Sequence, residues 1–223
     1  MPQYLAQING NNFALSKDEA RHLKVARLRA GDEIKIFDGK GNKFLALLKE
    51  AEGGIIIKPI PAITPKRQIH LYFSAISRPA AEDLLDKCTQ AGVYAFHPVI
   101  SARSDAELLK KWGTKSERWQ SILLAACKQC ETPFLPQIHA PVPFKNAVET
   151  AGTAIICYES EQKTSLLQAV KGDTLSIFIG PEGGYTGDEI KLARAAGIIP
   201  VTLGPNILRA ETAALAACWA ALQ

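Results

Sequence analysis

The sequence lacks the features that mark membrane-spanning, secreted and fibrous proteins. None of its 223 residues fall in a run of the ~18 consecutive apolar residues that a membrane-spanning helix needs. The first ten residues, MPQYLAQING, hold neither a basic segment nor an apolar one, so we expect no secretory signal. Internal repeats and low-complexity tracts are also missing, and the composition excludes collagen, a disordered tail and a coiled coil.

Cysteine is scarce and odd in number. The five cysteines are Cys88, Cys127, Cys130, Cys157 and Cys218. An odd count without a secretory signal argues against a disulfide framework, so we expect a cytoplasmic protein. Cys127-x-x-Cys130 could be half a metal site, but no second pair follows it and it lies late in an amphipathic helix, which favours buried helix cysteines. The histidines are scattered without ligand spacing, so we expect no metal. They are His22, His70, His97 and His139.

Composition is otherwise that of an ordinary globular protein, with 47% hydrophobic residues, 22% charged residues and a mean hydropathy of +0.00. The formal net charge is +4. Residues 1–67 hold 12 Lys and Arg against 7 Asp and Glu, whereas residues 68–223 hold 14 against 15. The positive excess therefore lies in the first third, where it indicates either a polyanionic partner such as RNA or a solvated lysine-rich surface.

A proline-rich segment, PIPAITPKR at residues 59–67, predicts a linker or a terminal edge strand between two domains, 1–67 and 68–223. Before it, Ser16 and Glu19 form a capping-box pattern at the start of a short helix. Strands are then predicted in EIKIFDG, KFLALLKE and IIIKPI, with glycine turns between them. Several short strands in about 65 residues favour a small barrel.

The second part alternates between apolar strands and amphipathic helices, which predicts a mostly parallel sheet covered on both faces. The strands expected here are IHLYFSAI, AFHPVI, TAIICYE, TLSIFIG and IIPVTLG. The helices expected between and after them are AAEDLLDKCTQAG, SERWQSILLAACKQC, KTSLLQAVKG, TGDEIKLARAAG and ETAALAACWAAL.

Two strands in this part end in glycine-bearing turns. The first strand runs into Gly180-Pro181-Glu182-Gly183-Gly184 and then into a helix capped by Thr186, with Glu189 at the capping-box position. Glycines at a strand's carboxyl end let backbone groups approach a ligand closely, and ligands of open parallel sheets bind there. The spacing matches neither dinucleotide nor nucleoside triphosphate motifs. On the glycines alone, a plain tight turn is the slightly better interpretation.

The second turn, at residues 203–213, reads LGPNILRAETA. It leads into a helix that is apolar nearly all round, and such a helix must be buried in a core or against a second subunit. Glu211 in its first turn suits the helix dipole, and a simple core helix would explain the same pattern.

Taken together, FIGPEGGYTGDE and LGPNILRAETAA resemble the bacterial 16S rRNA uridine N3-methyltransferases, a branch of the SPOUT (trefoil-knot) methyltransferases. HLKVARLRAGDEIKIFDGKG resembles the small PUA-like barrel of that family, and HPVISARSD and ERWQSILLAACKQC are similar to further segments of it. The resemblance covers most of the chain. It implies an α/β fold in which a PUA-like β-barrel precedes a trefoil-knotted methyltransferase domain with a parallel sheet.

The resemblance also implies S-adenosylmethionine as the cofactor, a uridine of 16S ribosomal RNA in the small subunit as the substrate, and a homodimer built on the C-terminal helix. The cofactor-binding residues implied are Tyr158, Glu159, Ile179, Gly180, Pro181, Gly183, Gly184, Leu203, Gly204, Ile207 and Leu208. Arg209 would stabilise charge or position phosphate, and Glu182 and Glu211 are the candidate bases, although Glu211 could instead be structural. The RNA-binding candidates are Lys24, Arg27, Arg29, Lys40, Lys43 and Arg103, for each of which plain solvation is the alternative.

This chain departs from the resembled family at three places. It has Gln90-Ala91-Gly92 where the family usually has Glu-Leu-Gly, Glu131-Thr132 where the family usually has Gly-Arg, and Asn206 where an arginine is usual. Two of these changes remove an arginine that could meet RNA. Two alternatives therefore stay open: a SPOUT enzyme acting on another RNA base, or a catalytically silent RNA-binding or ribosome-assembly protein.

Overall fold

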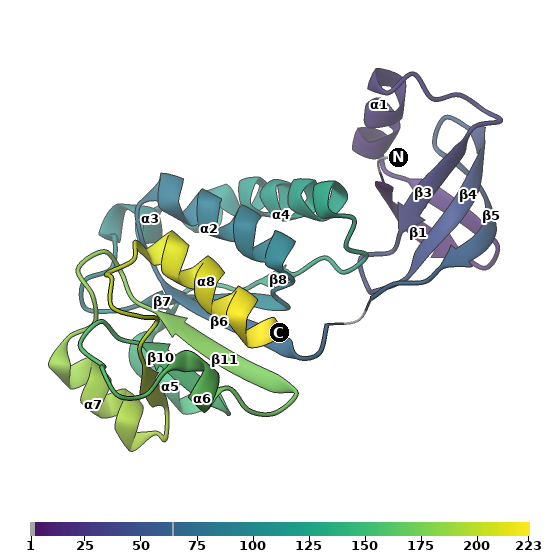
Figure 1. Ribbon diagram of the computed structural model, residues 1–223. Helices are drawn as coiled ribbons and strands as arrows, with labels where there is room; N and C mark the ends of the chain where they lie inside the picture. Colours follow the sequence, from purple (N-terminus) through teal and green to yellow (C-terminus); the bar gives the residue numbers. More distant parts are fainter. Residues whose placement is uncertain (1–2, 64) are drawn as a thin grey trace. The chain divides into compact units, whose positions relative to one another are not determined.

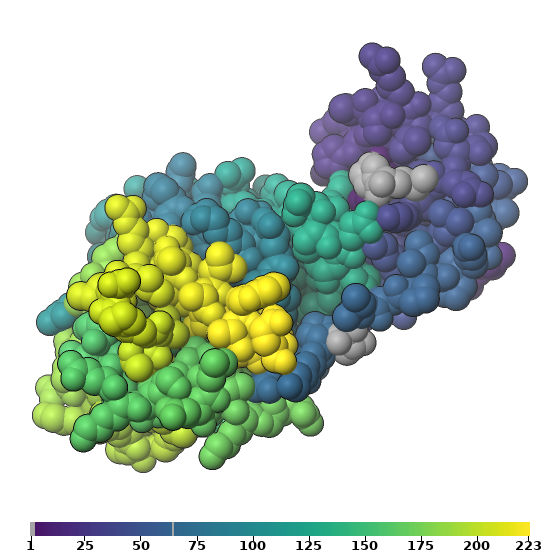
Figure 2. Space-filling view, in the orientation of Figure 1, coloured from purple at the N-terminus to yellow at the C-terminus, as the bar shows by residue number. Residues whose placement is uncertain are grey.

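The computed structural model describes residues 3–63 and 65–223 (Figures 1 and 2). They divide into two compact units: residues 3–63 with Leu124–Leu135, and Pro65–Leu123 with Pro136–Gln223. Thr64, which belongs to the segment predicted as a linker, lies outside the described residues. Among the described residues, none of the helices combines the length and apolar character that crossing a bilayer requires.

The first unit is a closed barrel of five strands in the order β1-β2-β5-β4-β3, closed by parallel pairing of β1 with β3. Its elements are β1 (Gln3–Asn9), β2 (Asn12–Leu15), α1 (Lys17–Val25), β3 (Glu33–Phe37), β4 (Lys43–Glu50) and β5 (Gly53–Ile60). Inward-facing side chains alternate along the strands, as the buried Ile34 and Ile36 of β3 do, and they form the barrel core. The strands predicted at β3, β4 and β5 are confirmed, whereas β1 and β2 are additions to the prediction.

Ser16 caps α1 as predicted, with its hydroxyl accepting from the Glu19 backbone N–H at 3.2 Å. The reciprocal half of the capping box is replaced by a different contact. The buried Glu19 carboxylate accepts from Lys128 Nζ at 2.9 Å, and Lys128 lies in the later segment that joins this unit. A buried carboxylate needs a paired cation, and this one comes from far along the chain.

Residues Leu124–Leu135 complete the barrel unit, whereas the sequence pattern predicts them as part of the second domain. Gln3 Nε2 donates to the carbonyls of Cys127, at 2.9 Å, and Thr132, at 2.8 Å. Glu131 accepts from Lys35 and Lys43, each at 2.9 Å. The backbone of Glu131 has φ 57, a conformation that favours glycine, and the resembled family usually has glycine at this position.

The two lysines make the stability of this contact depend on pH. Hydrogen bonds from Lys35 and Lys43 lower the pKa of the Glu131 carboxyl from 4.5 to about 2. A folded-state pKa below the unfolded value stabilises the fold above pH 4.5, and that stabilisation is lost as the pH falls from 4.5 toward 2. We therefore expect Glu131→Gln to lower the free energy of unfolding at pH 7, and the difference from wild type to shrink over that range.

Urea unfolding at several pH values measures this difference. Glu149→Gln is the matched control, because Glu149 is exposed and its lysine neighbour lies 4.0 Å away. A difference between wild type and Glu131→Gln that stayed constant from pH 7 to pH 2 would contradict the prediction.

The second unit is a seven-stranded sheet in which every pairing is parallel, in the order β12-β10-β11-β6-β7-β8, with β9 also paired to β7. Its strands are β6 (Gln68–Ser74), β7 (Ala95–Ile100), β8 (Gln137–Ile138), β9 (Val142–Pro143), β10 (Ala154–Cys157), β11 (Thr174–Ile179) and β12 (Ile199–Val201). Its helices are α2 (Arg78–Ala91), α3 (Ala106–Lys110), α4 (Ser116–Cys130, shared with the barrel unit), α5 (Phe144–Thr150), α6 (Leu166–Ala169), α7 (Gly187–Ala195) and α8 (Ala210–Leu222), with a 3₁₀ turn at Gly113–Lys115.

Helices cover both faces of this sheet (Figure 1). On one face, α5 and α7 pack on a core that includes Tyr72, Ile156 and Phe178. Successive strand residues point to opposite faces, so Leu71 and Phe73 point away from that core, toward α2 and α8. The parallel, two-sided sheet predicted from the sequence is confirmed, and α3, α5, β8 and β9 are additions to it.

The loop between β10 and α6 hydrogen-bonds to the end of β12 at both of its own ends. Tyr158 N–H donates to Val201 O, Thr202 N–H donates to Thr164 O, and Leu166 N–H donates to Thr202 O. The last strand thus lies beyond β10 while the last helix, α8, returns to pack on β6, β11 and α2. These bonds also explain a wrong prediction: the helix expected at 163–172 is only Leu166–Ala169, because the backbone before it pairs with Thr202.

Candidate functional site

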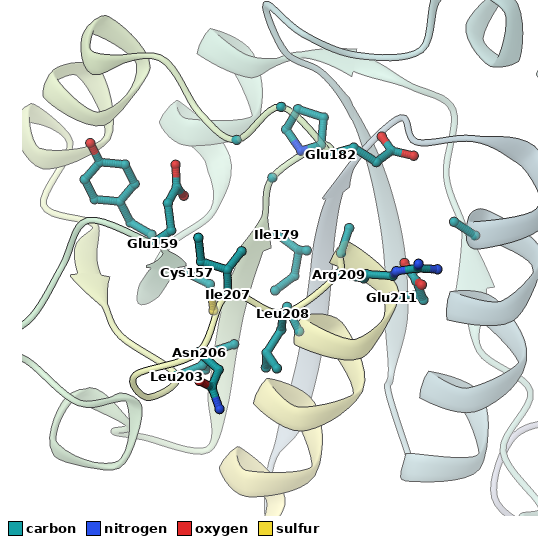
Figure 3. A pocket seen from close by; sticks show the side chains of 18 of the residues that line it. Cys157, Glu159, Ile179, Glu182, Leu203, Asn206, Ile207, Leu208, Arg209 and Glu211 are labelled. Atoms are coloured by element: carbon teal, nitrogen blue, oxygen red, sulfur yellow. The ribbon is translucent and has the colours of Figure 1, made fainter.

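A cavity of about 680 Å³ lies at the carboxyl edge of the sheet, where three segments far apart in sequence meet (Figure 3). The segments follow β10, β11 and β12, and the N-terminal turn of α2 forms the remaining wall. Neighbouring parallel strands end at the same edge, which is where open α/β sheets bind ligands. The volume lies within the range of small-molecule sites.

Every residue that the resemblance implies for the cofactor lines this cavity. They are Tyr158, Glu159, Ile179, Gly180, Pro181, Gly183, Gly184, Leu203, Gly204, Ile207 and Leu208. The three residues expected to act in catalysis, Glu182, Arg209 and Glu211, line it as well. The two glycine-bearing turns therefore form one site.

The turn after β11 is tightly constrained. Gly184 has φ +69, its N–H donates to Pro181 O at 2.8 Å, and a Cβ at this position would lie 2.6 Å from Glu159 Oε1. A Cβ on Gly183 would lie 3.1 Å from the Arg103 side chain. Both glycines thus permit approaches that larger residues would obstruct.

The helix that follows fixes the turn from its other end. Thr186 and Glu189 form the predicted capping box at the start of α7, with Glu189 N–H donating to Thr186 Oγ1 and Glu189 Oε2 accepting from Thr186 N–H at 2.8 Å. Glu189 Oε1 also accepts from the Ala102 N–H at 2.8 Å. One carboxylate therefore joins α7 to the loop after β7.

Glu182 is held at the start of α2. Its Oε1 accepts from the Ser77 backbone N–H at 3.0 Å, and Ser77 is the N-cap of α2 without a capping bond from its own side chain. The Glu182 side chain therefore ties the turn after β11 to the start of α2.

The turn after β12 is open toward the cavity. Gly204 has φ +124, a backbone conformation that L-residues rarely adopt, and Thr202 Oγ1 bonds with both the N–H and the carbonyl of Gly204. Ile207 is 86% exposed, although isoleucine is usually buried in folded proteins. The turn thus presents apolar side chains and backbone groups to a ligand.

The charge of the lining is unbalanced. Glu159, Glu182 and Glu211 supply three carboxylates, and Arg209 is the only cation among the described residues that line the cavity. Figure 3 shows Arg209 and Glu211 projecting from the start of α8. The site is thus suited to a ligand that carries positive charge.

Eight lining residues are additions to the predicted site: Ser77, Ala80, Cys157, Thr202, Pro205, Asn206, Ala210 and Ala213. Ser77 and Ala80 follow β6, which pairs with β11, so the strand order brings them to the cavity although the sequence alone does not predict that order. Cys157 ends β10, and burial raises the pKa of its thiol to about 12. It is therefore a protonated, unreactive wall residue at neutral pH.

The cations expected to bind RNA differ in their availability. Lys24, Arg27, Arg29 and Lys40 are exposed on the barrel. Lys43 is buried and its ammonium is bound by Glu131, so the structure argues against Lys43 as an RNA contact. Arg103 is exposed, but its guanidinium donates to the Gly183 carbonyl, which gives it a part in holding the turn after β11.

The histidines, scattered in sequence, are partly gathered in the fold. His70 Nδ1 lies 3.0 Å from His97 Nε2, and the rings of His97 and His139 stack with centroids 4.3 Å apart. Burial, with the neighbouring His139 and His70, lowers the pKa of His97 to about 3. In the part of the chain that the structure describes, no three His, Cys, Asp or Glu side chains are arranged to hold a metal ion.

Two family models match the chain. An RNA methyltransferase domain covers residues 64–222, and an RNA methyltransferase PUA domain covers residues 15–60. Among individual proteins, the chain is 36% identical to the ribosomal RNA small subunit methyltransferase E of Synechocystis sp., over 85% of this chain and 65% of that protein. It is 28% identical to the protein of the same name from Aquifex aeolicus, over 94% of this chain and 93% of that one.

Solved structures agree over nearly the whole length. A ribosomal RNA small subunit methyltransferase E from Neisseria gonorrhoeae, bound to S-adenosylmethionine, superposes with a TM-score of 0.89 at 30% identity, covering 98% of this chain and 95% of that one. A putative methyltransferase from Legionella pneumophila, also bound to S-adenosylmethionine, superposes with a TM-score of 0.88 at 26% identity, covering 99% of this chain and 95% of that one. The predicted fold class, a PUA-like barrel followed by a SPOUT α/β-knot domain, is confirmed, and the chain belongs to the ribosomal RNA small subunit methyltransferase E family of RNA methyltransferases.

Proposed function

We propose that this protein methylates N3 of a uridine in 16S ribosomal RNA of the small subunit, with S-adenosylmethionine as methyl donor. The observation that carries the proposal is the single cavity in which both glycine-bearing turns meet, in a chain with these relatives. Because the proposed substrate is ribosomal RNA, we also propose a cytoplasmic location.

The residues of the cavity fit S-adenosylmethionine. This cofactor carries a sulfonium, an ammonium and one carboxylate, so its net positive charge matches a lining with three carboxylates and one guanidinium. Leu203, Ile207 and Leu208 would pack against the adenosine, and the backbone of Gly180–Gly184, which lines the cavity, would hydrogen-bond the polar groups. When bound, the cofactor supplies a methyl group that is activated by its sulfonium.

The chain's own residues would prepare the uridine. Uracil N3 carries a proton and is a poor nucleophile until that proton leaves, and its departure puts negative charge on O2 and O4. Arg209, exposed at the cavity, would stabilise that charge. Glu211 would accept the proton, since Glu182 is already bonded to the Ser77 N–H.

The two units would divide the work. Lys24, Arg27 and Arg29 form an exposed basic run on the barrel, beside the exposed Val25, and Lys40 lies on another turn of the same unit. Such side chains contact phosphates without reading sequence. We therefore propose that the barrel unit grips RNA while the sheet unit holds cofactor and target base.

Mapping modified bases tests the function directly. We expect 16S ribosomal RNA from a deletion strain to lose one N3-methyluridine, and the purified protein with S-adenosylmethionine to restore it. Methylation restored on a different base would point to another substrate. Absence of cofactor binding by calorimetry would favour a silent RNA-binding protein.

We also propose that the protein is a homodimer that uses α8. Trp219 on this helix is 58% exposed and Leu167 on the adjoining α6 is 70% exposed, and α8 is apolar on nearly all sides. A tryptophan in the centre of an interface contributes at least about 2 kcal/mol, so we expect Trp219→Glu to weaken dimerisation by about 30-fold or more.

Light scattering measures this effect against the monomer mass of 24.1 kDa. Val25→Glu, which charges an exposed apolar residue of the barrel unit, should leave the dimer intact. A wild-type protein that is monomeric at micromolar concentration would refute the dimer proposal.

A further inference from the structure

A basic cluster lies beside the cavity in the sheet unit, separate from Arg103 and Arg209. Arg118 on α4 donates to both carboxylate oxygens of Glu82 on α2, from Nη2 at 2.8 Å and from Nε at 3.4 Å. Arg78 Nε lies 3.5 Å from Glu82 Oε1. The Lys115 charge also acts on this carboxylate. Two arginines thus contact one acid, and the charge of Lys115 adds to theirs, which leaves the cluster with an excess of positive charge.

Glu82 orders this cluster. Its side chain is only 20% exposed, whereas those of Arg78 and Arg118 are 59% and 58% exposed. The hydrogen bond from Arg118, together with the charges of Arg118, Arg78 and Lys115, holds the pKa of the Glu82 carboxyl below its usual range. The carboxylate therefore stays ionised and fixes two guanidinium groups whose exposed edges can meet a second acceptor.

The first turn of α2 contributes both to the cavity wall and to the cluster. Ser77 and Ala80 line the cavity, and Arg78 is between them in sequence. The first turn of α2 holds no acidic side chain, so its helix dipole adds to the positive field. Glu182 accepts from the Ser77 N–H on the cavity side, so the acidic lining and the basic cluster meet at neighbouring residues of α2.

Several cations of the barrel are already bound within that unit. Lys35 and Lys43 both bind Glu131, and Lys128 binds Glu19. Internal carboxylates thus neutralise part of the barrel's positive excess. A substrate with many phosphates needs further cations near the reacting base, and the sheet unit supplies them at the start of α2.

We propose that Arg78, Lys115 and Arg118 form a phosphate-binding cluster for the RNA backbone that flanks the target uridine. The inference rests on the proposed function, because it assigns a substrate contact to the same cavity. Guanidinium groups held in a fixed plane match phosphate oxygens, and a base inserted in the cavity brings its flanking phosphates to the cavity mouth.

The test measures binding of 16S ribosomal RNA over a range of salt concentrations. Removing one cation that neutralises a phosphate reduces the slope of log K against log salt by about 0.7 to 0.9, which at 0.15 M salt is about four- to fivefold in affinity. We expect this reduction for Arg118→Gln and again for Arg78→Gln. The loss of affinity in the double variant should be close to the product of the two single losses. Arg118→Lys should restore the salt slope in part.

Lys191→Gln is the control, since it removes one exposed cation of the same unit on α7. We expect its RNA affinity and salt slope to equal those of wild type. Cofactor binding by calorimetry should be unchanged in all the variants, because none of these side chains lines the cavity.

The binding readout does not depend on methylation, so it distinguishes the two proposals. Suppose that the wild-type protein binds RNA and the variants show the expected slope reductions, but the wild type methylates no RNA. That result would refute the proposed function and support the phosphate-binding cluster. If Arg118→Gln and Arg78→Gln had the same salt slope as Lys191→Gln, the proposed phosphate-binding cluster would be wrong. A lower melting temperature with an unchanged slope would overturn it too, because it would mark a purely structural link between α2 and α4.

Discussion

Replacing Arg209 by glutamine is expected to lower kcat for RNA methylation by about 10²- to 10³-fold, the usual cost of losing one preorganised donor to a developing anion. Arg209 is exposed, and it is the only cation among the described residues that line the cavity. Removal of its charge would leave the uracil oxygens without a positive neighbour as the N3 proton leaves. The measurement is single-turnover methylation of 16S ribosomal RNA with saturating cofactor.

Comparing the change in kcat with the change in KM for RNA identifies the role of Arg209. Charge stabilisation in the transition state predicts a fall in kcat with an almost unchanged affinity for S-adenosylmethionine, and partial recovery in Arg209→Lys. If the main effect were instead a raised KM for RNA with normal kcat, Arg209 would be a phosphate contact. Glu211→Gln under the same conditions tests the proton acceptor, and full activity of that variant would favour a structural role for Glu211.

Replacing Gly54 by alanine is expected to destabilise the barrel by at least about 3 kcal/mol, the upper end of the usual cost of overpacking. A Cβ on Gly54 would clash with the Leu47 carbonyl oxygen and would lie 3.0 Å from the Lys49 nitrogen. These are backbone atoms of β4, where the pairing with β5 shifts register, and they cannot rotate away. Denaturant unfolding, followed by separate probes of the two units, measures the destabilisation.

Gly187→Ala is the matched control, because a Cβ there meets nothing within 4 Å and the backbone needs no positive φ. We expect its stability to equal or slightly exceed that of wild type. If Gly54→Ala were as stable as Gly187→Ala, β4 and β5 could not be as closely paired as the structure has them.

Elements whose patterns are local can be predicted from the sequence. The helix at 116–130 is predicted to the residue, because Ser116 to Cys130 carries one continuous amphipathic period. Thr186 and Glu189 cap α7 as predicted, since a capping box is a signal within four residues. The glycine turns indicate the cofactor site only through the family resemblance of both segments, because a plain strand-to-helix turn explains the glycines by themselves.

Features that depend on distant partners cannot be predicted in the same way. The helix expected at 163–172 is cut short by pairing with Thr202, which lies far along the chain. Lys43 resembles a surface lysine in sequence, and only the fold reveals Glu131 beside it. Ser77 and Ala80 carry no motif, and only the strand order brings them to the cavity.

The bonds of Gln3 with Cys127 and Thr132 have a consequence for synthesis of the chain. A ribosome delivers the five barrel strands first, yet the segment that satisfies Gln3, Glu19, Lys35 and Lys43 is translated long after β5 ends. Until Leu135 has left the exit tunnel, the nascent barrel holds Glu19 without its lysine and Lys43 without its carboxylate. The amino-terminal unit therefore reaches its final stability only after a large part of the sheet unit's sequence has already been made.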